Sequence, residues 1–314
     1  MKSKGQRLVI VAQVMCLVLV PSWLIAFPAA FAVEVPSVPQ GEDAKAETPG
    51  GDSEKAAAPK QPAFNPKRDL LLLHYDHAPD KDDGHSAAAD RTLLMALQKV
   101  EWIKAHVVAV SGAYGINKPL FNKKSDAVMD AAWNDLGGWV AAHDDWDKAV
   151  EKLVERVSAA LSAGGDVWVK EGGQSDITAA VVKRIKVKLP EVDTTARIHV
   201  VQHSTWNEQK TTPEALVYTK AQTRYVRIKD ANAYLNQKGG DEAFTKAALV
   251  HPTCGAAWKA AFEYYKPETR LDFSDTGELL HILGLGEIGI DEFRTRYLEQ
   301  AKKAEATEPA TQEN

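Results

Sequence analysis

The sequence predicts an α/β fold in which a mostly parallel sheet carries helices on both faces, followed by a helical C-terminal part. Three observations predict it. Residues 69–75 (DLLLLHY) form a nearly continuous apolar run, as in a strand that is buried on both faces of a parallel sheet. Further short apolar runs follow along the chain, and helical segments separate most of them. Such alternation produces right-handed βαβ units.

We expect five strands, each a short run of apolar and β-branched residues. They are residues 69–75, 106–110, 166–169, 197–201 and 224–228. Parallel α/β sheets bind ligands beyond the carboxyl ends of their strands. The segments that follow these strands are therefore the first places to look for a functional site.

Helices are expected between the strands and beyond the last one. The clearest is residues 145–163, where Trp146, Val150 and Leu153 recur on one face and Gly164 marks the end. The other expected helices are residues 85–100, 176–189 and 212–221, and nearly everything after residue 230, including 278–283 and 291–301.

The two ends of the chain differ in composition from its middle. Residues 1–32 are predicted to be a signal peptide cleaved after Ala32, because a basic start precedes a long apolar run and an Ala-x-Ala end. The alternative is an uncleaved membrane anchor. Residues 33–64 and 301–314 contain few large apolar side chains, so we expect a disordered tether and a disordered tail around a folded domain at 65–300. This organisation predicts export to the periplasm or the extracellular space.

The overall charge and the cysteine content exclude several classes. The 314 residues carry 38 Lys and Arg against 43 Asp and Glu, a formal charge of −5, so nothing suggests a nucleic-acid partner. No membrane contact is expected after signal cleavage. Cys254 is then the remaining cysteine, which excludes an internal disulfide and suits a small buried residue better than a nucleophile. The sequence leaves open whether the chain forms a homo-oligomer.

A cluster of carboxylates follows the first strand. Asp76, Asp80, Asp82 and Asp83 lie close together in the loop. Two carboxylates about 4 Å apart repel by up to about 4 kcal/mol at an effective dielectric near 20, unless a cation or a helix N-terminus offsets them. Oxygen ligands suit a hard cation such as Ca²⁺ or Mg²⁺. The alternative is an Asp-rich turn in which Asp82 or Asp83 caps the next helix.

Three later segments also carry polar groups. Residues 171–176 (EGGQSD) combine two glycines with helix-capping side chains. Residues 202–209 (QHSTWNEQ) mix an aromatic ring with amide and carboxylate groups, which suit sugar hydroxyls or nucleosides, although a polar surface loop has the same composition. Residues 272–280 (DFSDTGELL) start a helix in which Asp275 is a capping residue.

Taken in this order, the four segments resemble the nucleoside hydrolase superfamily, in particular the divergent nucleoside hydrolase-like domains of exported bacterial proteins. The family's opening motif D-x-D-P-G-x-D-D has its ungapped counterpart in residues 76–83 (DHAPDKDD). Its G-P-L-T-N loop corresponds to residues 172–176, and its ribose-holding E-F-N loop to residues 206–209. Its late His-Asp pair corresponds to Ser274 and Asp275. The resemblance implies a Rossmann-like fold.

The resemblance also implies a Ca²⁺ site and a small-molecule partner, a sugar or a nucleoside. The implied metal ligands are Asp76, Asp82, Asp83, the backbone carbonyl of Ser175, and Asp275. The candidate substrate contacts are Trp206, Asn207, Glu208, Asn117 and His74. Asp80 is the candidate base for the attacking water, with Asp76 as the second candidate.

Two positions depart from the family pattern. Ala78 replaces the second Asp of the opening motif, which in the family is both a calcium ligand and the base, and Ser274 replaces the late His. These changes leave two function classes open. The first is a Ca²⁺-dependent hydrolase of an N-glycosidic (ribosyl) bond. The second is a Ca²⁺-containing sugar- or nucleoside-binding module with impaired catalysis.

Overall fold

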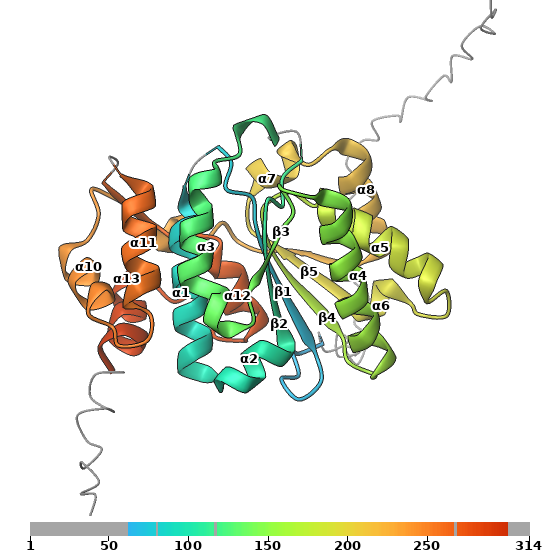
Figure 1. The fold of residues 1–314 in the computed structure, drawn as a ribbon, viewed down its shortest axis with the longest axis horizontal. Coiled ribbons are helices and arrows are strands. Elements are labelled where there is room, and N and C mark those ends of the chain that lie inside the picture. The colour runs from blue at the N-terminus through green and yellow to red at the C-terminus, as the bar shows by residue number, and fades with distance from the viewer. Residues whose placement is uncertain (1–61, 80, 116–117, 267–268, 301–314) are drawn as a thin grey trace, which may run out of the picture. The chain divides into compact units, whose positions relative to one another are not determined.

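The computed structural model describes residues 62–79, 81–115, 118–266 and 269–300. Within them, six strands form one parallel sheet in the order β3-β2-β1-β4-β5-β6 (Figure 1). The strands are β1 (Leu70–Tyr75), β2 (Val107–Ser111), β3 (Trp139–Ala141), β4 (Val167–Gly172), β5 (Ile198–Gln202) and β6 (Arg224–Arg227). The predicted α/β fold is confirmed, and every strand except β3 coincides with an expected one.

Helices lie on both faces of this sheet, as predicted (Figure 1). One side carries α1 (Asp82–Leu97), α3 (Asp126–Trp133), α11 (Gly255–Tyr265) and α12 (Thr276–Ile282), and the other carries α4 (Trp146–Ser162), α5 (Asp176–Lys188) and α8 (Pro213–Gln222). The shorter helices are α2 (Val100–His106), α6 (Thr194–Arg197), α7 (Thr205–Lys210), α9 (Asn232–Leu235), α10 (Glu242–Leu249) and α13 (Ile290–Phe293). Three 3-10 turns, Lys118–Leu120, Lys123–Ser125 and Asn134–Leu136, and a π-helical turn, Arg294–Glu299, complete the described elements.

Strand β1 is buried on both faces because its successive side chains alternate between two cores. Leu71, Leu73 and Tyr75 join the core on the α1 side. Leu70 and Leu72 join the core on the α4 side. The continuous apolar run that predicts this strand therefore serves both sides of the sheet.

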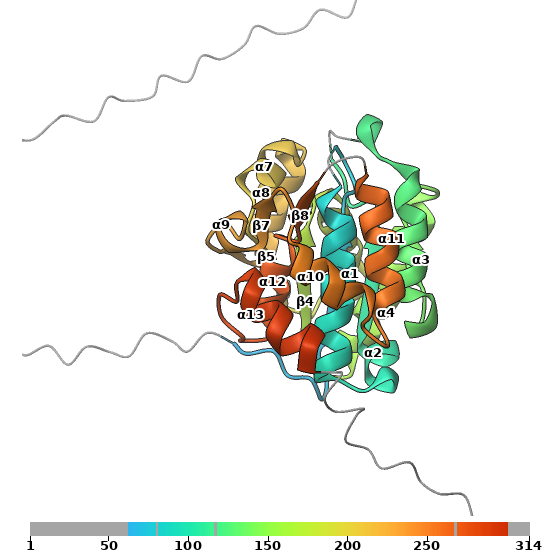
Figure 2. The same cartoon turned by 90° about the vertical axis from the view of Figure 1, so that its left-hand side faces the viewer.

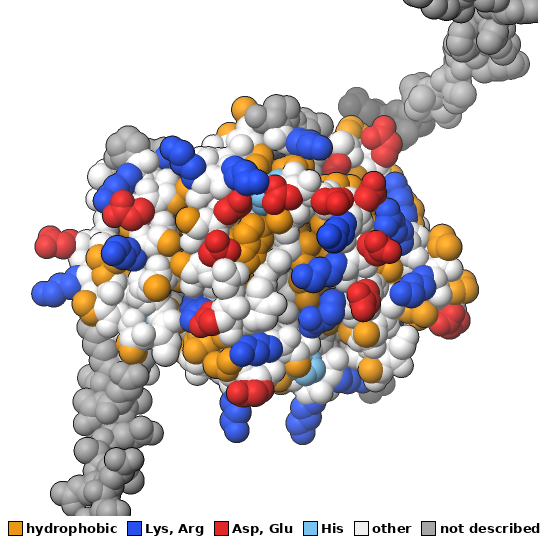
Figure 3. Space-filling model, in the orientation of Figure 1, with side chains coloured by type: hydrophobic (Ala, Val, Ile, Leu, Met, Phe, Trp, Pro, Cys, Tyr) orange, Lys and Arg blue, Asp and Glu red, His pale blue; other side chains and the backbone are white. Residues whose placement is uncertain are grey.

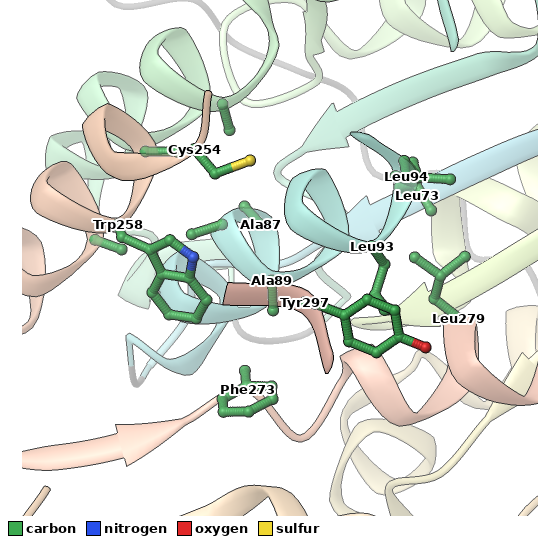
Figure 4. Packing of buried hydrophobic residues seen from close by; sticks show 14 of the residues in the cluster. Leu73, Ala87, Ala89, Leu93, Leu94, Cys254, Trp258, Phe273, Leu279 and Tyr297 are labelled. Atoms are coloured by element: carbon green, nitrogen blue, oxygen red, sulfur yellow. The ribbon is translucent and has the colours of Figure 1, made fainter. Parts of the chain in front are cut away.

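Figure 4 shows the core on the α1 side, where segments distant in the sequence meet. Trp258 of α11 and Phe273, just after β8, belong to the same cluster as Leu93 of α1. The Trp258 indole N–H donates to Thr92 Oγ1 at 3.0 Å, which satisfies the one polar atom of this buried ring. Cys254 is fully buried in this cluster, so its interpretation as a small core residue is confirmed.

The order of the strands reverses at β1. The chain first builds β2 and β3 on one side of β1, and then returns to place β4 on its other side. Where a parallel sheet reverses in this way, the loops after the two central strands diverge and open a crevice at the carboxyl edge. The segments after β1 and β4 both carry polar residues that are predicted to belong to a functional site.

The C-terminal part is less uniformly helical than the sequence predicts. Strands β7 (Asn236–Lys238) and β8 (Arg270–Asp272) form an antiparallel pair beside α9 (Figure 2). Each strand has three residues, most of them polar, so no apolar alternation marks it. The three-residue strand β3 escapes prediction because of the same short length.

The predicted signal peptide, most of the predicted tether and the predicted tail lie outside the described residues. At the end of the expected tether, Phe64 contacts Trp102 and Trp168 edge-on, with ring centroids 6.2 Å apart in both pairs. Across the described ranges, no helix has both the length and the apolar character needed to cross a bilayer.

Basic and acidic side chains are interspersed over the face that carries α3, α4 and α5 (Figure 3). The most basic stretch of the folded domain, residues 183–188, lies on α5. Its Arg184 pairs with Asp147 of α4 at 3.0 Å. This stretch is therefore a solvated helix face with acidic neighbours.

Candidate functional site

A pocket of about 160 Å³ lies at the carboxyl edge of the sheet and includes the last residue of β4. We call it the acidic pocket. Its walls come from the segments after β1, β5 and β8, from the start of α1, from α7 and α9, and from the β7–β8 pair. The lining residues are Asp76, Asp82, Asp83, Gly172, His203, Ser204, Trp206, Asn207, Asn232, Asn236, Arg270, Asp272, Ser274 and Asp275.

Four of the five predicted metal ligands line the acidic pocket. Asp76 follows β1, Asp82 and Asp83 begin α1, and Asp275 immediately precedes α12. Carboxylate oxygens of Asp82, Asp83 and Asp275 lie within 4.8 Å of one another. The fold therefore brings Asp275 to the loop after β1 from a distant part of the sequence, which is the convergence that a shared metal site requires.

Asp83 is the most buried of the clustered carboxylates. Its Oδ2 accepts the backbone N–H of His77 at 2.5 Å, while its Oδ1 is buried and has no hydrogen-bond partner in the described part of the chain. Burial, followed by the charges of Asp76 and Asp275, raises the pKa of Asp83 well above its usual value. The Oγ of Ser274, which also lines the pocket, is likewise buried and has no partner among the described residues. Both oxygens suit a bound cation or a ligand hydroxyl.

Asp275 is fixed through both of its oxygens. Nε2 of His203 lies 3.0 Å from Oδ1, and the Ser86 hydroxyl donates to Oδ2 at 3.2 Å. Nδ1 of His203 lies 3.3 Å from a carboxylate oxygen of Asp230. The backbone N–H of Ala231 also points at Nδ1 at 3.3 Å, but the carboxylate is the stronger partner, so we assign a proton to this nitrogen.

The two carboxylates decide the charge of His203. Burial lowers the pKa of His203, but the hydrogen bonds to Asp230 and Asp275 outweigh burial and raise it to about 10. His203 is therefore a buried imidazolium at neutral pH, beside the metal ligand candidate Asp275. His203 is not among the predicted site residues, although it lies in the polar segment after the fourth expected strand.

Asp76 is held by neighbouring N–H groups. Its Oδ1 accepts the backbone N–H of Ala78 at 2.9 Å, and its Oδ2 accepts the side-chain amide of Gln174. Gln174 is fully buried; its amide nitrogen also lies 3.4 Å from Asn207 Oδ1, and its Oε1 accepts the backbone N–H of Gly115 at 2.9 Å. Gln174 thus joins the loops after β1, β2 and β4. Its position directly after two glycines was the one sequence signal for this role.

Two predicted substrate contacts, Trp206 and Asn207, line the pocket from α7. The Ser204 hydroxyl caps this helix by accepting the backbone N–H of Asn207 at 3.2 Å. Trp206 is 37% exposed, and Lys210 Nζ lies over its ring at 5.8 Å from the ring centre, whereas Asn207 is buried. The pair supplies a stacking surface and an amide, the two groups that sugar and nucleoside recognition needs.

The C-terminal part supplies four pocket residues that the sequence analysis did not select: Asn232, Asn236, Arg270 and Asp272. They come from α9 and from the β7–β8 pair, which the sequence pattern does not reveal. Burial and the charge of Asp275 raise the pKa of Asp272 to about 6, and Nε of Arg270 lies 3.8 Å from its Oδ2. A carboxylate that titrates near neutrality is suited to proton transfer.

Two predicted substrate contacts point away from the acidic pocket. His74 faces α5, with Nδ1 3.0 Å from Glu171 Oε1, because strand alternation gives it the face opposite to that of Tyr75. Glu208 accepts the hydroxyl of Tyr225 at 3.0 Å and pairs with Lys220 at 2.8 Å, because each step along a helix turns the side chain by about 100°. Neither side chain lines the acidic pocket, so the structure does not bring these two predicted contacts together with the others.

The predicted backbone ligand Ser175 also lies outside the pocket lining. Its carbonyl accepts the N–H of Ala179 at 2.9 Å as the first acceptor of α5, and it accepts the Thr219 hydroxyl at 3.5 Å. Gly172 provides the backbone that lines the pocket at this end of β4. The remaining two predicted residues, Asp80 and Asn117, lie outside the described residues.

The donor set of the acidic pocket fits a hard divalent cation. The converging ligand atoms of Asp82, Asp83 and Asp275 are all carboxylate oxygens. Ca²⁺ takes six to eight oxygen ligands, and Mg²⁺ is usually held by one or two carboxylates together with waters. Three or four carboxylates therefore leave ligand positions for water or for substrate hydroxyls.

Comparison with known proteins adds little to this description. No protein-family model matches the chain, and no curated protein matches it. Among solved structures, the chain is similar to a glucose-6-phosphate dehydrogenase in complex with its substrate glucose-6-phosphate, with a TM-score of 0.31 and 13% identity over 61% of this chain. The match covers 41% of that enzyme, so this chain spans less than half of its length. A similarity at this level carries no functional argument.

Residues 284–289 (GLGEIG) have the glycine spacing of dinucleotide-binding loops. That motif requires a strand before it and a helix after it, whose N-terminus receives the pyrophosphate. Here the segment follows helix α12 and precedes the four-residue α13. It is a turn between helices, in which Gly284 and Gly286 adopt φ angles of 69° and 77° that favour glycine.

Proposed function

We propose that the chain is an exported nucleoside hydrolase-like protein that hydrolyses an N-glycosidic (ribosyl) bond with the help of a hard divalent cation, Ca²⁺ being the first candidate. The observation that carries the proposal is the convergence of Asp275 with Asp82 and Asp83, whose ligand atoms lie within 4.8 Å of one another. A buried oxygen without a partner, Asp83 Oδ1, gives independent support.

Asp82, Asp83 and Asp275 would hold the cation. When bound, the cation would supply positive charge that orients sugar hydroxyls. The protein's own contribution is to keep these carboxylates in place, through the His77 N–H on Asp83 and through His203 and Ser86 on Asp275.

The size of the pocket favours a single sugar ring. Pockets for drug-sized ligands measure about 300–1,000 Å³, and the acidic pocket has about 160 Å³. Asn207 and Asn232 would bind hydroxyls inside it, because both amides line the walls. The leaving group would then lie toward the half-exposed Trp206, whose ring can stack on a planar base.

Hydrolysis also needs a base for the attacking water. As this water bonds to the anomeric carbon, the C–N bond breaks, its electron pair leaves with the base moiety, and the transition state resembles an oxocarbenium ion. Asp80 is the first candidate for this base, by its position in the sequence of the loop after β1. Asp272 is a second candidate, because it lines the pocket and its pKa is raised to about 6.

The test is turnover of purine and pyrimidine ribonucleosides by the full mature chain, with and without a chelator. We expect product that requires the divalent cation, and loss of turnover in Asp275→Asn. Asp80→Asn and Asp272→Asn identify the base, since loss of a general base lowers kcat by about 10²–10⁴-fold. The exposed Asp147→Asn serves as the matched control and should keep full activity. Chelator-insensitive turnover would contradict the proposal.

The second candidate function is a sugar- or nucleoside-binding module without hydrolysis. Two observations favour it: Ala78 stands at the family's base position, and Asp76 already accepts two N–H groups. Calorimetric titration of ribose and ribonucleosides in the presence of Ca²⁺ separates the two functions. Binding without product formation would select the module.

Export is proposed from the N-terminal sequence alone. Cell fractionation with N-terminal sequencing of the mature protein tests it, and we expect the chain to begin directly after Ala32. Full-length protein in the cytosolic fraction would contradict export. Gel filtration of the mature chain then gives the oligomeric state.

A further inference from the structure

Lys170 is a fully buried lysine in the middle of the protein. It lies on β4, and its Nζ is 3.3 Å from Asp90 Oδ2 and 4.0 Å from the centre of the Tyr75 ring. The Tyr75 hydroxyl donates to the same oxygen of Asp90 at 2.6 Å. Removing a lysine charge from water costs several kcal/mol even with a partner, so this placement needs a reason.

The ammonium lies directly beneath the acidic pocket. Gly172 lines the pocket, and a Cβ built on it would be 2.6 Å from Lys170 Nζ and 3.0 Å from Asp275 Cβ. The glycine therefore leaves the space that the ammonium occupies. The Lys170 ammonium and the metal ligand candidate Asp275 thus lie on either side of the space that a side chain at position 172 would fill.

The ammonium keeps its charge in this position. Burial lowers the pKa of Lys170, but the charges of Asp90, Asp275 and Glu278 outweigh burial and raise it above its usual value. Two of the carboxylates that line the pocket, Asp275 and Asp83, contribute to this shift, so the ammonium and the pocket carboxylates lie within electrostatic range of one another.

We propose that Lys170 is a built-in counter-charge of the acidic pocket, which weakens the binding of a divalent cation and thereby sets its affinity. The inference rests on the proposed function, because it concerns the cation of the same site. The ammonium repels the bound cation while it attracts the carboxylates that hold it. Lys170 is thus a positioning residue that acts through charge, without touching the ligand.

The test is calorimetric titration of the full mature chain with Ca²⁺ alone, and separately with Mg²⁺ alone, at fixed ionic strength. We expect Lys170→Met to bind Ca²⁺ at least ten times more tightly than the wild type. If Lys170 only supported the fold, its loss would weaken Ca²⁺ binding. The direction of the change in affinity therefore separates the counter-charge role from a structural role. Arg91→Met is the matched control. It removes another buried cationic side chain, which pairs with Asp135 at 2.7 Å and is no part of the pocket. The Arg91→Met protein should therefore bind Ca²⁺ with the affinity of the wild type.

Lys170→Met leaves Asp90 without its ion-pair partner. If this variant does not fold, the same comparison is made between two proteins that both carry Asp90→Asn. There, Lys170→Met/Asp90→Asn should bind Ca²⁺ at least ten times more tightly than Asp90→Asn. Equal or weaker binding in the lysine variants, with a wild type that binds, would overturn this inference and leave the proposed function standing. If neither wild type nor variant binds either cation, the inference and the proposed cation site both fail.

Discussion

His203 and Asp275 form a buried pair in which Nε2 of the imidazole lies 3.0 Å from Oδ1 of the carboxylate. The pair joins the segment after β5 to the start of α12, and both residues line the acidic pocket. Because the other oxygen of Asp275 accepts the Ser86 hydroxyl at 3.2 Å, the carboxylate plane is fixed. A ligand carboxylate that is oriented before the cation arrives loses less entropy on binding.

The first prediction follows from this orientation. His203→Gln keeps a donor but removes both the positive charge and the ring geometry. The lost charge alone would favour the cation, but the lost orientation of the ligand Asp275 should outweigh it, so we expect Ca²⁺ affinity to fall about tenfold, at the low end of the range for partners of metal ligands. Isothermal titration with Ca²⁺ measures it. Asp147→Asn is the control, since this exposed carboxylate lies on α4 and is no part of the pocket. An unchanged affinity in His203→Gln would mean that Asp275 needs no such support.

The second prediction concerns the free energy of unfolding when no cation is bound among the pocket carboxylates. Burial and the neighbouring carboxylates raise the pKa of Asp83, so its ionised form destabilises the fold. Asp83→Asn retains an acceptor for the His77 N–H and removes the charge. In the presence of a chelator it should raise the free energy of unfolding by about 1–2 kcal/mol, while Ca²⁺ binding is lost. Urea unfolding checks this, with the exposed Asp147→Asn expected to change stability by less than about 0.5 kcal/mol. A destabilised Asp83→Asn protein would contradict the argument.

The sequence predicts the parallel sheet well because its strands are fully buried. Each inner strand must be apolar on both faces, so the runs at β1 and β5 are visible without any knowledge of their neighbours. The convergence of Asp275 with the loop after β1 was also predictable, because four segments of the sequence occur in the same order as the motifs of a known superfamily. No local sequence pattern alone predicts such a long-range contact.

Other site residues could not be predicted because their roles depend on three-dimensional neighbours. Asn236 and Asp272 reach the pocket on three-residue strands that carry no periodic signal. Glu208 directly follows the pocket residue Asn207, and only the rotation of α7 directs it toward Tyr225. The role of Lys170 depends on a space left by Gly172, two residues further along the same strand.

The third prediction compares a substrate-contact candidate that lines the pocket with one that does not. Asn207→Ala removes a lining amide and should weaken ribose or ribonucleoside binding by about 2–12-fold, since one hydrogen bond contributes about 0.5–1.5 kcal/mol. Glu208→Gln should leave binding unchanged, because this carboxylate pairs with Lys220 at 2.8 Å outside the pocket. Calorimetric titration of both variants gives the comparison. A loss of affinity in Glu208→Gln would restore the original assignment of Glu208.

The last prediction is a pH dependence of stability that arises far from the pocket. His199 is buried against Trp168, with ring centroids 4.1 Å apart, and its Nε2 lies 3.2 Å from Asp166. Burial lowers the pKa of His199 below its usual 6.5, and the attraction of Asp166 only partly offsets this. The folded protein therefore holds this ring neutral at a pH at which the unfolded chain already takes up a proton.

Below about pH 6.5, proton uptake by the unfolded chain lowers the free energy of unfolding by up to about 1.4 kcal/mol per pH unit for one such group. His199→Gln keeps a donor for Asp166 but cannot titrate, so its stability should fall less steeply than that of the wild type between pH 6.5 and pH 5. Above pH 7.5 the difference between the two proteins should be constant, which provides the internal control. Urea unfolding in the presence of a chelator measures both ranges, and parallel curves below pH 6.5 would show that His199 is protonated in the folded state as readily as in the unfolded chain.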